Sequence, residues 1–125
     1  MQNISYAGTV ICIVDASIKA SFFKVVEDFK ASGKRVLCII GASSRSQIKD
    51  EDKIASLSDE VLIATTDGSY GRKGSVVDIL KDVFGVIEKS THTIYPEVIY
   101  CCVQPDVKQE IIELAHSNKI KIITE

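Results

Sequence analysis

The stretch best suited to chemistry runs from Thr65 to Gly74 and reads Thr-Thr-Asp-Gly-Ser-Tyr-Gly-Arg-Lys-Gly. Its glycines permit tight turns and a close approach of backbone to a ligand. Its hydroxyls, carboxylate and basic side chains can hydrogen-bond ribose and phosphate. A helical apolar pattern begins directly after it, at Ser75, and N–H groups at a helix start attract phosphate. The pattern favours a nucleotide site, while spacing alone fits a solvated glycine-rich turn equally well.

Other reactive side chains give weaker signals. Tyr70 can stack on a base or a ribose, or pack within its own loop. His92 and His116 lack the neighbours at ligand spacing that a metal site needs, so we expect no metal. The cysteines do not form a Cys-x-x-Cys pair, and each lies in an apolar run, which favours buried, reduced thiols. They are Cys12, Cys38, Cys101 and Cys102.

The elements that position the loop follow from hydrophobic periodicity. Short runs rich in Val and Ile predict five strands, at Thr9–Val14, Arg35–Ile40, Glu60–Ala64, Val98–Val103 and Lys119–Ile123. Segments with helical periodicity separate them, with Gly33 as a stop signal and Pro105 near a helix start. Strands that alternate with helices imply a parallel sheet. We predict an α/β, Rossmann-like three-layer sandwich: a five-stranded parallel sheet of order 3-2-1-4-5, with helices on both faces.

Such sheets bind ligands beyond the carboxyl ends of their strands. This directs attention to the loops that follow the first four strands, at 15–20, 41–46, 65–74 and 104–106. A chain of 125 residues fits one domain. Its net charge of −2 argues against a nucleic-acid binder, and no apolar run approaches the length of a membrane span. We therefore expect a cytoplasmic protein without nucleic-acid or membrane partners.

The segment Val61–Gly74 resembles the Thr-Asp-Asp-Gly-Ser-x-Gly motif of the ferredoxin–NADP reductase superfamily. The branch most similar is that of dihydroorotate dehydrogenase electron-transfer subunits, with sulfide dehydrogenase and NADH-dependent ferredoxin:NADP oxidoreductase subunits. The resemblance extends over nearly the whole chain, from Gly8–Val14 to the strand that ends near Thr124. It implies a pyridine-nucleotide-binding module of a flavin-dependent oxidoreductase, which places NAD(P)H against FAD for hydride transfer.

In this family an FAD-binding barrel precedes such a domain and a cysteine-rich segment for a [2Fe–2S] cluster follows it. The resemblance therefore implies that residues 1–125 are one domain of a longer protein, incomplete as an enzyme by itself. FAD and [2Fe–2S] would belong to other parts or to a partner. The implied partners are an FAD-binding domain, in cis or in trans, and a catalytic dehydrogenase or oxidoreductase subunit.

The resemblance also implies which residues bind the cofactor. They are Ser17 after the first strand, Gly41, Ala42, Ser43 and Arg45 after the second, Thr65, Thr66, Asp67, Gly68, Ser69, Tyr70 and Gly71 after the third, and Gln104 after the fourth. Cys102 stands where some relatives have a cysteine that faces the nicotinamide, and is the candidate for a catalytic role.

The chain departs from the family pattern at two of these loops. The usual glycine-rich turn after the first strand is replaced by Asp15-Ala16-Ser17-Ile18-Lys19-Ala20, so Asp15 introduces a charge that repels phosphate. After the fourth strand, Val103-Gln104-Pro105 lacks the usual glycine. Two interpretations remain: a domain that still binds nucleotide, or a degenerate one that serves as a scaffold or docking subunit. A response-regulator-like domain is disfavoured, because no acid ends the third strand.

Overall fold

The computed structural model describes residues 8–15, 20–89 and 96–124. The chain alternates strands and helices, as expected. The elements are β1 (Thr9–Asp15), α1 (Ala20–Ala31), β2 (Arg35–Ala42), the 3₁₀ helix η1 (Arg45–Gln47), α2 (Glu51–Leu57), β3 (Glu60–Thr65), β4 (Arg72–Lys73), α3 (Val76–Lys89), β5 (Val98–Cys102), α4 (Pro105–Ser117) and β6 (Lys121–Thr124).

The sheet is parallel and has the order β4-β3-β2-β1-β5-β6. The five predicted strands keep their predicted order, but the predicted number of strands is wrong because β4 makes a sixth. β4 is two residues long and pairs with Ala64 and Thr65 at the end of β3. Gly68 and Gly71 have φ angles of +73° and +66°, which turn the loop back beside β3. Two charged residues in a loop carry no strand periodicity, so the sequence pattern did not reveal them.

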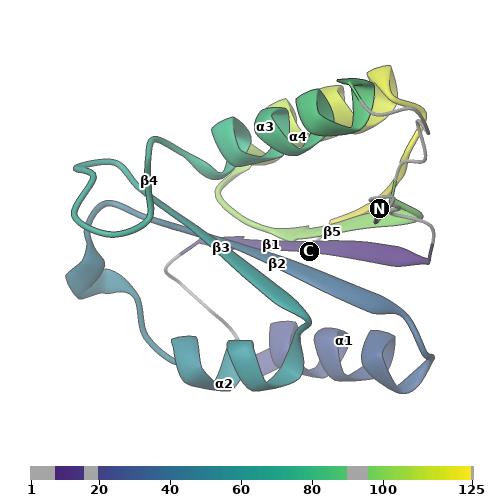
Figure 1. Cartoon of the computed structure of the whole chain (residues 1–125), viewed down its shortest axis with the longest axis horizontal. Helices are drawn as coiled ribbons and strands as arrows, with labels where there is room; N and C mark the ends of the chain where they lie inside the picture. The colour runs from purple at the N-terminus through teal and green to yellow at the C-terminus, as the bar shows by residue number, and fades with distance from the viewer. Residues whose placement is uncertain (1–7, 16–19, 90–95, 125) are drawn as a thin grey trace.

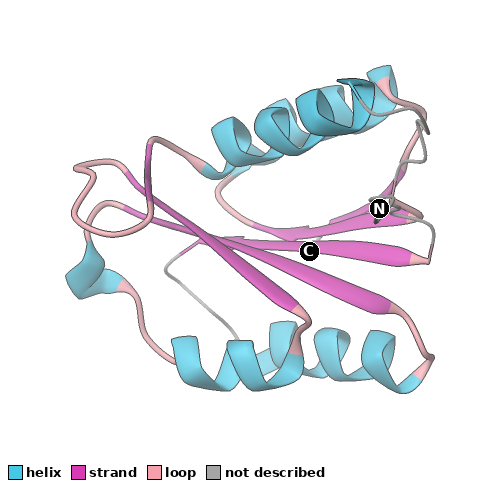
Figure 2. Ribbon diagram, viewed as in Figure 1, coloured by secondary structure: helices cyan, strands magenta, loops and turns pink. Residues whose placement is uncertain are grey.

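Helices cover both faces of the sheet, which confirms the three-layer arrangement (Figures 1 and 2): α3 and α4 lie on one face, and α1 and α2 on the other. Strand alternation separates the core into two clusters. Ile11 and Ile13 pack toward α3 and α4, and Val10 and Cys12 pack toward α1 and α2. Strands β1 and β5 are buried almost throughout, as their continuous apolar character predicted.

Two helix ends show how local signals set the boundaries. After α1, Gly33 has φ +81°, its N–H donates to the carbonyl of Lys30, and the N–H of Lys34 donates to Phe29. This bonding confirms the predicted stop. After α4, Lys119 has φ +57° and donates its N–H to His116, so it belongs to the helix end. The last strand therefore begins at Lys121, two residues later than predicted.

Among the residues that the structure describes, no helix is both long enough and apolar enough to span a membrane.

Candidate functional site

An open cleft of about 630 Å³ lies at the carboxyl ends of the central strands, beside the start of α3. This is where the strand order reverses, since β1 pairs with β2 on one side and with β5 on the other. Ligands of open α/β sheets bind at this position. The lining residues are Asp15, Gly41, Ala42, Ser43, Ser46, Gln47, Lys49, Thr66, Gly74, Ser75, Val76, Val103, Gln104 and Val107.

The Thr65–Gly74 loop at one border of the cleft is held by its own polar groups. Asp67 Oδ1 accepts hydrogen bonds from the N–H and the hydroxyl of Ser69, at 2.9 and 2.6 Å. These bonds from Ser69 hold the pKa of the Asp67 carboxyl below its ordinary value. The hydroxyl of Thr65 donates to the carbonyl of Tyr70 and accepts its N–H. The loop therefore presents an ionised carboxylate in a defined conformation.

The loop that follows β2 is bonded to this one. The N–H of Arg45 donates to Ser69 Oγ at 2.8 Å, and the N–H of Asp67 donates to the carbonyl of Ser43 at 3.1 Å. The guanidinium of Arg45 lies 4.8 Å from the centre of the Tyr70 ring, a cation–π distance. The Tyr70 hydroxyl donates to Glu51 at 2.6 Å, which raises the pKa of Tyr70. The residues predicted after the second and third strands thus form one connected group.

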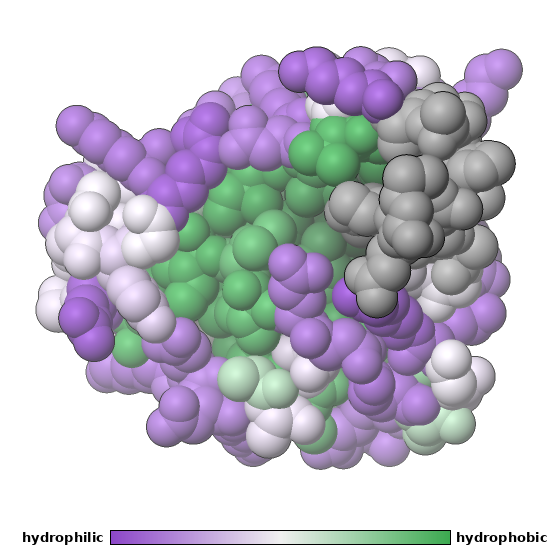
Figure 3. Space-filling view, viewed as in Figure 1, coloured by the Kyte–Doolittle hydropathy of each residue, from purple (hydrophilic) through white to green (hydrophobic). Residues whose placement is uncertain are grey.

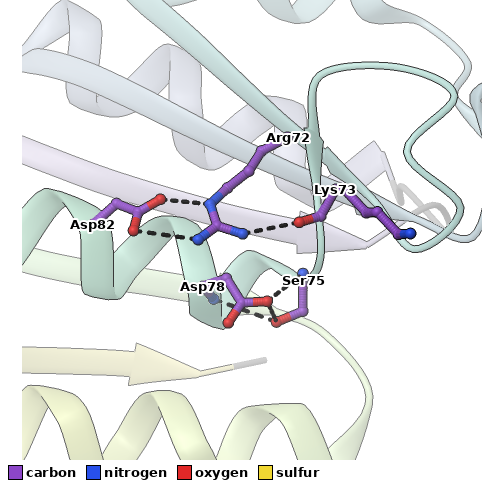
Figure 4. A network of polar contacts seen from close by, with 5 residues as sticks. All are labelled: Arg72, Lys73, Ser75, Asp78 and Asp82. Atoms are coloured by element: carbon purple, nitrogen blue, oxygen red, sulfur yellow. Dashed lines mark hydrogen bonds and ion pairs between the residues drawn. The ribbon is translucent and has the colours of Figure 1, made fainter.

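The start of α3 is capped by side chains of its own first turn. Ser75 and Asp78 form a capping box: Asp78 Oδ2 accepts the N–H of Ser75 at 2.9 Å, and the N–H of Asp78 donates to Ser75 Oγ at 3.3 Å (Figure 4). Arg72 bonds Asp82 and the carbonyl of Lys73 (Figure 4). The N–H groups of Ser75 and Asp78 therefore already have acceptors within the chain. The guanidinium of Arg72 is bonded to Asp82 of α3.

Gly41 lines the cleft at a position where a side chain would collide with Val76 of α3. A Cβ atom at this position would lie 2.6 Å from Val76 Cγ1. The absence of a side chain therefore lets the first turn of α3 approach β2. The end of β1 and the start of α4 are joined directly, because Asp15 Oδ2 accepts the N–H of Gln104 at 3.1 Å.

The predicted site residues fall into four groups. Those that line the cleft are Gly41, Ala42, Ser43, Thr66 and Gln104. Those in the bonded loops beside it are Arg45, Thr65, Asp67, Gly68, Ser69, Tyr70 and Gly71. Cys102 is buried with the cluster against α1 and α2 and does not line the cleft. Ser17 lies outside the described residues.

Among the polar residues that line the cleft, the sequence reasoning missed Gln47 and Lys49. Gln47 Oε1 accepts the N–H of Ser43 at 2.9 Å, and Lys49 provides a positive charge from the segment after η1. A lone lysine between helices carries no motif, so its position could be learned only from the fold. In the described parts of the chain, no three potential metal ligands of the His, Cys, Asp and Glu types converge.

A second hollow, of about 670 Å³, lies along the part of the β3 edge that β4 does not pair, at Val61–Ile63. We call its aliphatic lining the β3-edge strip: Val61, Leu62, Ile63, Ile79, Val83 and Val86. Tyr70, Arg72 and Asp82 form part of its rim. Figure 3 shows the apolar surface of this side, bordered by hydrophilic residues.

Comparison with known proteins finds electron transfer subunits of dihydroorotate dehydrogenase B among the relatives. No protein-family model matches the chain. The probable dihydroorotate dehydrogenase B (NAD(+)) electron transfer subunit of Methanopyrus kandleri is 28% identical over 101 residues, or 81% of this chain and 36% of that protein. The subunit of the same description from Pyrococcus furiosus is 32% identical over 74% of this chain and 34% of that protein. The chain thus spans about a third of the length of these relatives.

The same fold occurs in solved structures of other proteins. The C-terminal domain of a Pyrococcus furiosus hydrogenase superposes with a TM-score of 0.69 at 7% identity, over 100% of this chain and 95% of that one. The structure of an NADH-dependent reduced ferredoxin-NADP oxidoreductase superposes with a TM-score of 0.70 at 20% identity, over 98% of this chain and 42% of that one.

Proposed function

Since the chain is a ferredoxin reductase-like domain, we propose that it binds NADH or NADPH and positions the nicotinamide against a flavin held by another domain. The main support for this proposal is that the loops after β2 and β3 are bonded to each other at the border of the cleft. Ser69 bonds both Asp67 and the backbone of Arg45. A loop held by its own side chains is ordered before a ligand arrives, which reduces the entropy lost on binding.

The cleft fits the proposed ligand in size and chemistry. A volume of about 630 Å³ is within the range of cofactor sites. In this proposal the ionised Asp67 accepts hydrogen bonds from ribose hydroxyls, and Arg45 with Tyr70 borders the adenosine half. Lys49 supplies positive charge for phosphate. Gln104, at the far side of the cleft, borders the nicotinamide half. The bound nicotinamide supplies the hydride, and this chain contributes position and electrostatics.

The proposal includes the partners that the resemblance implies. The relatives are described as electron transfer subunits, which favours a catalytic oxidoreductase subunit as partner, besides an FAD-binding domain. A [2Fe–2S] cluster would belong to a partner or to another part of the protein. The cysteines of this chain are buried, and they are divided between the two hydrophobic clusters on opposite faces of the sheet. This arrangement does not fit four cysteines that bind one iron–sulfur cluster together.

A scaffold or docking role without nucleotide binding is the second candidate. The observation that favours it is Asp15, whose carboxylate lines the cleft at the end of β1. Neither candidate function assigns Cys102 a catalytic role, because its side chain is buried in the core.

Calorimetric titration with NADH and NADPH tests the proposal. The chain should bind at least one of them saturably, and Asp67→Ala should weaken binding by at least about tenfold, because hydrogen bonds to a charged group contribute on the order of 1.5–3 kcal/mol. Asp28→Ala is the control, since Asp28 forms an exposed pair with Lys24 on α1. Absence of heat up to millimolar nucleotide would reject autonomous binding and favour the scaffold role.

A further inference from the structure

Asp15 occupies a central position in the cleft. It is the last residue of β1, the strand that lies between β2 and β5 in the sheet. Its side chain lines the cleft and accepts the N–H of Gln104, the residue directly before α4, at 3.1 Å. The carboxylate therefore stands where the end of β1 meets the start of α4.

The positive and the negative charge that line the cleft lie in different loops. Among the described lining residues, the charged side chains are Asp15 and Lys49. The start of α3 already bonds Asp78 through the N–H of Ser75. Both helix starts at the cleft thus have a carboxylate of this chain as hydrogen-bond acceptor. A phosphate at either position would meet a like charge, whereas Lys49 attracts phosphate from the side of the β2 loop.

We infer that Asp15 is a specificity-determining residue of this cleft, which disfavours phosphate at the end of β1 and the start of α4. This inference rests on the proposed function, because it concerns the same nucleotide site. The cleft accordingly takes an uncharged adenosine group without penalty and binds phosphate-bearing ligands more weakly than its shape alone would allow. Phosphates then lie toward Lys49 and away from Asp15.

Asp15→Asn isolates the charge. Asparagine has nearly the shape of aspartate, and its side-chain oxygen can still accept the N–H of Gln104. Asp106→Asn is the matched control: Asp106 lies in the first turn of α4, is exposed, and does not line the cleft. Both variants remove one negative charge from the same region, so a difference between them reports the location of the charge.

The probes are adenosine, ADP and NADH, titrated calorimetrically into the wild-type chain and both variants at low and at physiological salt. Asp15→Asn should tighten ADP and NADH by at least about fivefold at low salt, from the repulsion expected over ~4 Å in a water-like medium. Adenosine should change by less than about twofold, and Asp106→Asn should change no ligand by more than that. The gain should shrink as salt screens the charge. Thermal unfolding confirms that each variant is folded.

The outcomes separate this inference from the proposed function. If the wild type binds nucleotide and Asp15→Asn gives no gain, or an equal gain for adenosine, the inference is overturned and the proposed function stands. Equal gains from Asp15→Asn and Asp106→Asn also overturn it, because they indicate a general charge effect. If no protein binds any probe, the proposed function is rejected and the inference is rejected with it.

Discussion

The carboxylate of Asp59 connects the turn between α2 and β3 to β2 and to α1. It lies between α2 and β3, and its Oδ2 accepts the N–H of Val36, at the start of β2, at 2.7 Å. Lys30, in the last turn of α1, bonds the same carboxylate at 3.0 Å. The hydrogen bond from Val36, followed by the bond from Lys30, holds the pKa of Asp59 below its ordinary value. The folded state therefore favours the ionised carboxylate.

This pKa shift gives stability a defined pH dependence. A depressed folded pKa stabilises the fold above the unfolded pKa of about 3.9, and this contribution is lost as pH falls through the folded value. Asp59→Asn should lower the free energy of unfolding at pH 7 by about 1 kcal/mol, discounted for partial exposure. As pH falls below about 4, the difference from the wild type should shrink and then disappear. Urea unfolding across this range measures both, and an equal difference at every pH would contradict the assignment.

At the scale of elements, the turn between β3 and β4 depends on backbone conformation. Gly71 has φ +66°, and a Cβ atom there would collide with the carbonyl of Ile63. The neighbouring chain cannot give way easily, because the atom met belongs to the backbone of β3. Gly85, in the middle of α3, is the opposite case: a Cβ atom there has no neighbour within 4 Å.

Substitution of these two glycines by alanine should therefore act in opposite directions. Gly71→Ala should destabilise the fold by at least about 2 kcal/mol, from the left-handed backbone and the collision together. Gly85→Ala should stabilise it by about 0.5–1 kcal/mol, since alanine is the better helix former. Chemical denaturation measures both. A neutral Gly71→Ala would show that β4 is not fixed by this turn.

The elements differ in how far the sequence could predict them. Strands β1, β2 and β5 could be predicted, because burial on both faces requires continuous apolar runs. Strand β4 could not, because its pairing arises from glycine conformations and not from side-chain periodicity. The Thr65–Gly74 motif located one border of the cleft. The bond between Asp15 and Gln104 joins residues 89 positions apart, so it becomes visible only after the sheet is assembled.

At the scale of the whole molecule, the β3-edge strip is an apolar surface to which β3 and α3 both contribute. Val86 is 48% exposed, which is unusual among the large apolar side chains described. Exposed apolar patches bind hydrophobic probes and association partners more than scattered apolar residues do.

A charge placed on this strip should reduce the binding of hydrophobic probes without changing the fold. Val86→Lys should reduce the fluorescence of a hydrophobic dye bound to the native chain, with stability within about 0.5 kcal/mol of the wild type. Glu88→Gln, on the same helix, makes the same change in net charge at an exposed polar position. An equal loss of dye binding in both variants would assign the effect to net charge and not to the strip.

The sheet order has a consequence for how the chain folds. The central strand β1 pairs with β2 through Thr9 and Arg35, but its partner on the other side is β5, where Val10 meets Val98. Strands β1 to β3 with α1 and α2 can therefore assemble during synthesis, while the face that will receive α3 and α4 is still open to water. Contacts so distant in sequence slow folding, and a half-covered sheet is prone to aggregation. Because α4 follows β5 in the chain, this face is covered only after Ser117 has been synthesised, and we expect the domain to be most prone to aggregation before that point.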